Sequence, residues 1–200
     1  MRRFHWLVLL ALSIFLGSAA IAQQPAAPQT AAAAPAFSPV ASILELMQEI
    51  VDPTADFIFE SVSVIVTKEG EKETRPRTDE EWLAIRHQAL ILAESGNLLK
   101  MRGRTVAPAK PIRGIEFEPP GPDDLPPARV QELLKKNPVP FENFAQKLTE
   151  AALIAVRAVD ARSVDGLYEA GDAIDEACEN CHLVYWYPGS PSTRKPIEPR

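Results

Sequence analysis

The chain has 200 residues, of which 46% are hydrophobic and 24% are charged, and its formal net charge at pH 7 is −6. This composition supports one folded domain with a hydrophobic core and argues against a mostly disordered chain. The negative charge argues against nucleic acid or an anionic membrane as the partner.

Residues 1–22 have the pattern of a cleavable secretory signal. A basic start at Arg2 and Arg3 precedes an apolar run over residues 6–16, and small residues end at Ala22. The apolar run is too short to span a bilayer comfortably, and no later stretch approaches the length of a membrane span. We therefore expect a periplasmic protein, cleaved after about Ala22, with no membrane span in its mature form.

Three further segments follow the signal. Residues 23–40 are rich in Ala, Gln and Pro, a composition that predicts a flexible linker. Residues 41–188 carry the helical patterns described below and are the expected folded domain. Residues 189–200 are expected to be a disordered tail.

A first helix is predicted over residues 42–66. Ser42 and Glu45 have the spacing of a capping box, and apolar residues recur downstream at helical spacing. Pro53 removes one backbone hydrogen bond inside this segment, so a kink or break is expected near Asp52. The residues of the expected buried stripe are Ile43, Met47, Ile50, Thr54, Phe57, Ser61 and Ile65.

A second helix is predicted to begin at a capping box formed by Thr78 and Glu81 and to end near Arg102. Its expected buried stripe consists of Trp82, Ile85, Ala89, Leu92 and Leu99. The stretch over residues 105–137 is rich in Pro and Gly, which predicts a long loop, with a short helix over residues 128–136.

Two more helices follow the loop. Pro138 and Pro140 mark the start of the third, whose apolar stripe includes Phe141 and Phe144. Ser163 begins the fourth. We find no strand alternation and no internal repeat, so we predict an all-α fold, most simply a four-helix bundle with a long Pro-rich loop between its second and third helices.

The fourth helix carries the one specific motif. Cys178, Cys181 and His182 form a C-x-x-C-H sequence, which in an exported protein is the attachment sequence for c-type haem. Residues three and four apart share a face of a helix, so these three side chains can address one flat ligand. The motif predicts one covalently attached haem c, with Cys178 and Cys181 as the attachment residues and His182 as an iron ligand.

Three other interpretations of the two cysteines are open. A disulfide between Cys178 and Cys181 would close a very small loop and would constrain the unfolded chain little. A thioredoxin-like redox pair is expected at a helix N-terminus in a βαβ unit, which this sequence does not predict. A zinc site would need a fourth ligand, and His87 is the one other histidine left after cleavage of the signal.

With this motif on its last helix, the chain resembles the cytochrome c′ and cytochrome c556 family, which are class II c-type cytochromes. The resemblance covers Ser42 to Pro188 in helix order and motif placement. It implies a four-helix bundle whose first helix supplies the sixth iron ligand, a methionine in the c556 branch, or leaves that site open in the c′ branch. It also implies a possible homodimer that pairs through the first two helices.

Met47 is similar in position to the methionine of the c556 branch, because it lies in the second turn of the first predicted helix on its apolar face. A thioether is a soft ligand that favours reduced iron. Ordinary core filling is the alternative role for Met47. Met101 and His87 are the rival ligands.

The first predicted helix lacks the basic residue that often faces the haem propionates in this family. Arg86, Arg102 or Arg104 are candidates to replace it.

These observations predict a periplasmic monohaem c-type cytochrome that transfers single electrons between redox partner proteins. We find no catalytic constellation, so an enzyme is not expected. A five-coordinate haem protein that binds NO or CO is the first alternative. A haem subunit of an oxidoreductase complex is the second.

Overall fold

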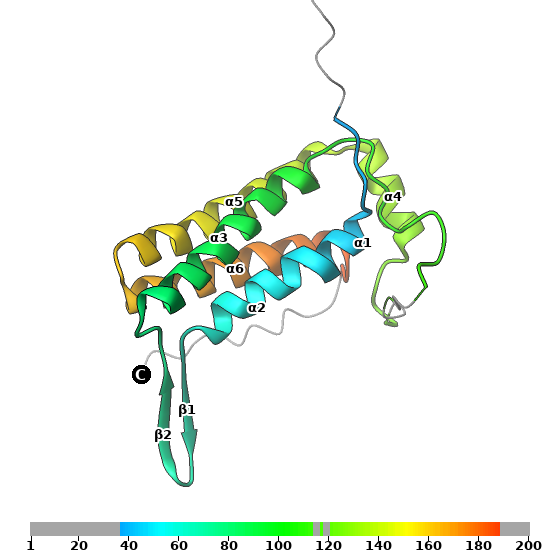
Figure 1. Cartoon of the computed structure of the whole chain (residues 1–200). Coiled ribbons are helices and arrows are strands. Elements are labelled where there is room, and N and C mark those ends of the chain that lie inside the picture. The colour runs from blue at the N-terminus through cyan, green and yellow to red at the C-terminus, as the bar shows by residue number, and fades with distance from the viewer. Residues whose placement is uncertain (1–36, 114–116, 118–120, 189–200) are drawn as a thin grey trace, which may run out of the picture. The chain divides into compact units, whose positions relative to one another are not determined.

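The computed structural model describes residues 37–113, 117 and 121–188. The expected signal at 1–22, most of the linker at 23–40 and the tail at 189–200 lie outside the described residues. The described part of the chain is mostly helical, with one two-stranded sheet (Figure 1). This mostly helical content is compatible with the predicted all-α fold class, although the sheet was not predicted.

The first helical segment consists of α1 (Ile43–Leu46), a π-helical turn (Met47–Val51) and α2 (Asp52–Glu60). Its start is the predicted capping box. The Ser42 N–H donates to the Glu45 carboxylate at 2.7 Å, and the Glu45 N–H donates to the Ser42 hydroxyl at 3.2 Å. These two bonds satisfy backbone donors that a helix start leaves without intrahelical partners.

The π-helical turn lies where the sequence predicted a kink. The N–H of Asp52 donates to the carbonyl of Met47, five residues back, which widens the turn just before Pro53. The Thr54 hydroxyl also donates within this segment, to the carbonyl of Ile50 at 2.6 Å and to that of Val51 at 3.0 Å. The irregular turn thus lies directly before the residue that has no N–H.

The wider turn also shifts the buried stripe by one residue. Ile58 is fully buried, whereas Phe57, predicted to be buried, is 40% exposed. A π-helical turn holds one residue more than the regular spacing allows, so every position after it moves around the helix axis. The predicted stripe is confirmed at Thr54, which is buried, and was wrong at Phe57.

The prediction of helix up to residue 66 was also wrong. The chain leaves α2 at Glu60 and forms an antiparallel hairpin from β1 (Ser63–Thr67) and β2 (Gly70–Thr74). Most residues of β1 are β-branched, which favours extended backbone over helix. Gly70 supplies a φ of +127° directly after the two-residue turn, a conformation that few other residues adopt.

The other helices are α3 (Asp79–Leu99), α4 (Pro127–Lys136), α5 (Val139–Asp160) and α6 (Val164–Tyr185). Each lies where the sequence predicted a helix, although α3 ends about three residues early. None of the described helices combines the length and apolar character that crossing a membrane requires.

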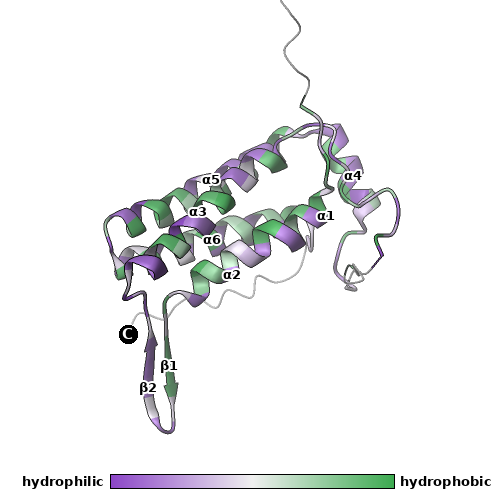
Figure 2. Cartoon of the chain, viewed as in Figure 1, coloured by the Kyte–Doolittle hydropathy of each residue, from purple (hydrophilic) through white to green (hydrophobic). Residues whose placement is uncertain are grey.

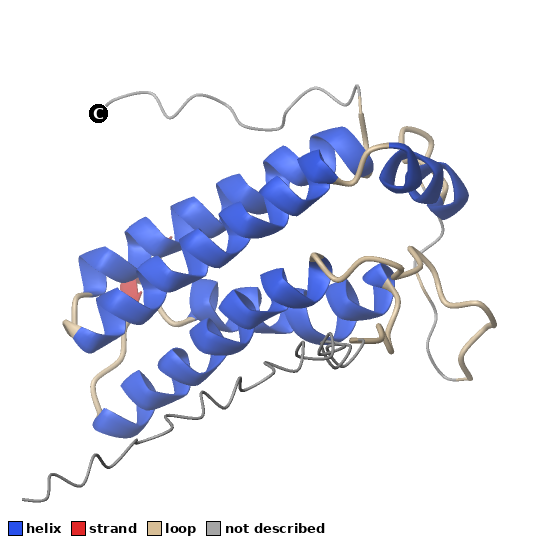
Figure 3. Cartoon of the chain, turned by 90° about the horizontal axis from the view of Figure 1, so that it is seen from above, coloured by secondary structure: helices blue, strands red, loops and turns tan. Residues whose placement is uncertain are grey.

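The long helices lie side by side (Figures 1 and 3). Helix α3 packs against α5, α5 packs against α6, and α2 contacts both α3 and α6. The core between them is built from side chains of all four, among which the fully buried ones include Ile58, Leu92, Ala152, Ala155, Leu167 and Ile174.

Backbone hydrogen bonds join the Pro-rich loop to the start of α1 and to the end of α6. The N–H groups of Ile43 and Leu44 donate to the carbonyls of Thr105 and Val106 at 2.9 and 3.0 Å. Further along, the N–H of Leu125 donates to the carbonyl of Trp186 at the end of α6. The loop therefore holds the start of α1 and the end of α6 at the same end of the helical domain.

The capping box of α3 predicts a pH dependence of stability. The Glu81 carboxylate accepts from the N–H of Arg77 at 2.6 Å and of Thr78 at 2.9 Å, and these bonds lower its pKa from the ordinary value of 4.5. Their contribution is complete above pH 4.5 and is lost as the pH falls through the lower folded-state pKa. Glu81→Gln should therefore flatten the fall in the free energy of unfolding below pH 4.5, measured by urea titration. An equally steep fall in both proteins would contradict this prediction.

Candidate functional site

The motif of α6 and the predicted sixth ligand line the same cavity. Cys178, Cys181 and His182 lie in the last two turns of α6, and Met47 begins the π-helical turn. All four line one cavity of about 130 Å³. The structure therefore brings together residues that are more than 130 positions apart in the sequence.

The rest of the cavity wall is apolar with an acidic rim. Its apolar residues are Val51, Ala55, Phe59, Leu99, Phe141, Phe144, Ala145, Leu148 and Ala177, and its acidic residues are Asp52, Asp56 and Asp175. Helices α2, α3, α5 and α6 all contribute to it. A mostly apolar wall with a few convergent polar groups is the usual composition of a cofactor site.

The two cysteines are free thiols in this structure. Burial raises the pKa of Cys178 to about 11 and that of Cys181 to about 12, and nearby negative charge adds to both shifts. Both groups are therefore protonated thiols at neutral pH, which makes them poor nucleophiles for disulfide exchange.

The imidazole of His182 is also desolvated. Burial lowers its pKa, although Asp52 and Glu179 act in the opposite direction. A neutral imidazole keeps a lone pair for a metal. The ring of Tyr187 lies edge-on to that of His182 with 5.7 Å between centroids, and the Tyr187 hydroxyl donates to Glu179 at 2.7 Å. The residues that follow α6 thus turn back beside the histidine.

The geometry disfavours the other interpretations of the cysteine pair. The thiols are unbridged, and they lie at the C-terminal end of α6 with raised pKa values, whereas a thioredoxin-like pair needs a lowered pKa at a helix N-terminus. In the described part of the chain, no three His, Cys, Asp or Glu side chains are arranged to hold a metal ion, as a zinc site would need.

Neither rival ligand lines the cavity. The sulfur of Met101 accepts a hydrogen bond from Arg104 at 3.7 Å and faces a different cavity. His87 is exposed on α3. Of the methionines and histidines in the described residues, Met47 and His182 are the two that meet at this site.

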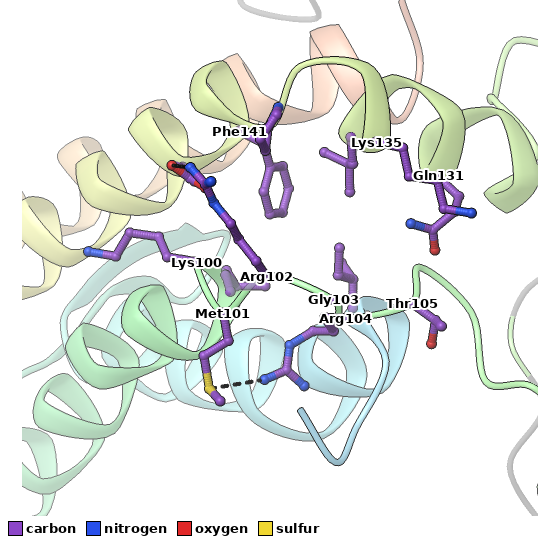
Figure 4. A pocket seen from close by; sticks show the side chains of 14 residues that line it. Lys100, Met101, Arg102, Gly103, Arg104, Thr105, Gln131, Lys135 and Phe141 are labelled. Atoms are coloured by element: carbon purple, nitrogen blue, oxygen red, sulfur yellow. Dashed lines mark hydrogen bonds and ion pairs between the residues drawn. The ribbon is translucent and has the colours of Figure 1, made fainter. Parts of the chain in front are cut away.

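A second cavity, of about 320 Å³, adjoins the first. Leu99 and Phe141 line both cavities. Figure 4 shows this second cavity, with Phe141 on one side and the residues that follow α3 on the other. The two cavities therefore share part of their walls.

The three candidate arginines for the propionates have different surroundings. Arg86 pairs with Asp160 at 2.8 Å, and neither residue lines the candidate site. Arg104 is buried and donates to the carbonyls of Ala41 and Leu98. Arg102, paired with Glu142 at 2.8 Å, is largely exposed on the second cavity. Arg102 is therefore the one of the three with an accessible guanidinium on the adjoining cavity.

Sequence reasoning missed much of the cavity wall. Phe141 and Phe144 were assigned to an apolar stripe, which predicts burial but not the partner. In the structure both rings lie edge-on to Tyr185, at 5.4 and 6.2 Å between centroids. From the sequence, Asp52 was expected only to mark the kink in the first helix. Burial and the neighbouring Asp56 raise its pKa, and it interacts electrostatically with His182.

Comparison with family models, with curated proteins and with solved structures gives no match to this chain. The function is therefore inferred from the residues of the site.

Proposed function

We propose that the protein is a haem protein of the c type, with one haem c attached through Cys178 and Cys181 and ligated by His182. The observation that carries this proposal is the convergence of two thiols, a neutral imidazole and the thioether of Met47 on one apolar cavity. Cys178 and Cys181 would hold the haem covalently, which would retain the cofactor in an exported protein.

The donor set fits haem, but the cavity must enlarge before it can hold the group. At about 130 Å³ the cavity is below the range of about 300 to 1,000 Å³ that is typical of ligand sites. The adjoining cavity supplies further volume once Leu99 and Phe141 move. Arg102 at that side is then the residue we assign to a propionate.

Within haem proteins, we assign the chain to the monohaem cytochromes that transfer electrons, in a four-helix arrangement of α1–α2, α3, α5 and α6. Haem, when bound, supplies a one-electron iron couple. Met47 and His182 would hold the iron from two elements, and the Phe residues of the wall would exclude water. With both of these ligands supplied by the protein, the site would rearrange little during electron transfer. The electron donor and acceptor are periplasmic redox proteins in this proposal.

Met47 distinguishes this function from gas binding. In the haem-loaded protein, Met47→Ala should convert a low-spin spectrum with sharp reduced α and β bands into a high-spin one, because the sulfur ligand is removed. The far-red sulfur-to-iron charge-transfer band should disappear as well. The measurement is the visible spectrum of the oxidised and the dithionite-reduced protein.

Met101→Ala is the matched control, because Met101 is a half-buried methionine that does not line the cavity shared by Met47 and His182. Its spectrum should equal that of the wild type. A wild-type protein that is high-spin, binds CO readily and does not respond to Met47→Ala would contradict Met47 ligation and support the five-coordinate alternative.

A further inference from the structure

The β1–β2 hairpin extends away from the helices and is not covered by any described element (Figure 1). Its first strand is apolar and its second strand is charged, as Figure 2 shows. Val64, Ile65 and Val66 of β1 are 50%, 52% and 77% exposed. Two strands alone are marginally stable in water, and three or more strands are usually needed for a stable sheet.

The outer edge of β1 is open. Hydrogen bonding in an antiparallel pair alternates along each strand, so every second residue of β1 turns its N–H and C=O away from β2. Such an edge is a template for another strand. Unlike most open edges in native proteins, this one carries no charge and no proline between Ser63 and Thr67.

The sequence of β1 is chemically symmetric about its centre. Ser63 and Thr67 carry hydroxyls at the two ends, Val64 and Val66 flank the centre, and Ile65 occupies it. If two copies of β1 pair antiparallel about a two-fold axis at Ile65, each residue meets its own kind: Ile65 meets Ile65, Val64 meets Val66, and Ser63 meets Thr67. Apolar and hydroxyl pairs of this type stabilise neighbouring strands.

The edge of β2 has the opposite character. The same symmetric pairing of two β2 strands would place Lys72 opposite Lys72 and Glu71 opposite Glu73. Like charges directly opposite one another destabilise a strand pair. The charges on β2 therefore disfavour self-pairing at its edge, whereas the uncharged edge of β1 can pair with a second copy.

We propose that β1 is a self-association edge, through which two copies of this chain join their hairpins into one four-stranded antiparallel sheet. The contact is isologous, as a two-fold dimer requires. It uses neither the haem site nor the faces of α1 to α3, so it goes beyond the proposed function. Because five residues per copy make less than a standard interface, the dimer is weak and reversible.

Sedimentation velocity of the full exported protein tests the proposal. From about 1 μM to about 1 mM, the range in which small interfaces dissociate, the weight-average mass should rise from monomer toward dimer. Ile65→Asp places two like charges at the two-fold axis and should keep the protein monomeric over the whole range. Leu83→Asp is the matched control: Leu83 is 61% exposed on α3, and this variant should dimerise like the wild type.

Cross-linking tests the register. Directly opposite residues in an antiparallel pair have Cα atoms about 4.5 to 5.5 Å apart, within disulfide range. Under a mild oxidant, Ile65→Cys should give a reducible dimer, while Val64→Cys, whose equivalent in the partner lies about 8 Å away, should give at least several-fold less. The proposal would be overturned by a protein that stays monomeric at every concentration, or by equal cross-linking at both positions. It would also be overturned by a dimer that survives Ile65→Asp or is lost in Leu83→Asp. Both readouts are independent of haem.

Discussion

Replacing Cys178 and Cys181 together by serine is expected to abolish covalent haem. The chain has these two cysteines and no others, so no thiol remains to add to a vinyl group. The protein should be expressed with a c-type maturation system, denatured, separated on a gel and stained for haem. The wild type should stain strongly, and the double variant should not stain.

The single variants separate haem attachment from a fold defect. Either Cys178→Ser or Cys181→Ser keeps one thiol, so each should retain weak, one-link haem staining. Serine is close in volume to cysteine, and both sites are incompletely buried, so the variants should keep the helical circular dichroism of the wild type. Undiminished staining of the double variant would refute attachment at the motif.

Gly96→Ala is expected to have the largest effect on stability. Gly96 of α3 faces Thr149 of α5, and an added Cβ would clash with the Thr149 hydroxyl and lie 2.6 Å from the carbonyl oxygen of Ala145. That hydroxyl already donates between the helices, to the carbonyl of Ala93 at 3.0 Å. The clash must therefore push α3 and α5 apart.

Overpacking of this kind costs about 1 to 3 kcal/mol, which outweighs the gain of about 0.5 to 1 kcal/mol from placing Ala rather than Gly in a helix. Since 1 kcal/mol shifts Tm by about 2 to 4 °C in a domain of this size, we expect a fall of several degrees in thermal denaturation.

Gly171→Ala in α6 is the control for the argument about Gly96. There an added Cβ would lie 3.6 Å from the ring of Phe59, an ordinary contact. The helix-propensity gain should then appear without a clash, and Tm should stay level or rise. If Gly96→Ala raised Tm as Gly171→Ala does, the close approach of α3 and α5 would be wrong.

Capping boxes, prolines and apolar spacing predicted the helices well wherever these short-range preferences agree with the packing of the folded chain. Thr78 and Glu81 predicted the start of α3, and Pro138 with Pro140 predicted the start of α5. The predicted stripe of α3 is buried throughout, at Trp82, Ile85, Ala89, Leu92 and Leu99. These signals act within a few residues, so they need no knowledge of the rest of the chain.

The failures lie in the segment where two local preferences compete. Residues 61–66 continue an apolar helical spacing and are also mostly β-branched. The extended conformation is adopted because Gly70 and the two-residue turn before it allow a hairpin. The phase error at Phe57 has a similar origin, since Pro53 predicts an irregularity but not that it adds a residue to the turn.

The candidate site could be predicted only in part. Cys178, Cys181 and His182 form a recognisable motif, and Met47 followed from the resemblance to a family. The wall formed by Phe141, Phe144 and Leu99 depends on which helices pack together, which a single sequence does not specify. The same holds for the cavity beside Arg102.

The mass of the intact exported protein, measured by mass spectrometry under denaturing conditions, tests the central claim most directly. The account predicts one species, heavier than the polypeptide by the mass of one haem. After proteolysis, the peptide that contains Cys178 and Cys181 should carry this added mass. A mass equal to the polypeptide alone, or lower by the two hydrogens that a disulfide removes, would contradict covalent haem attachment.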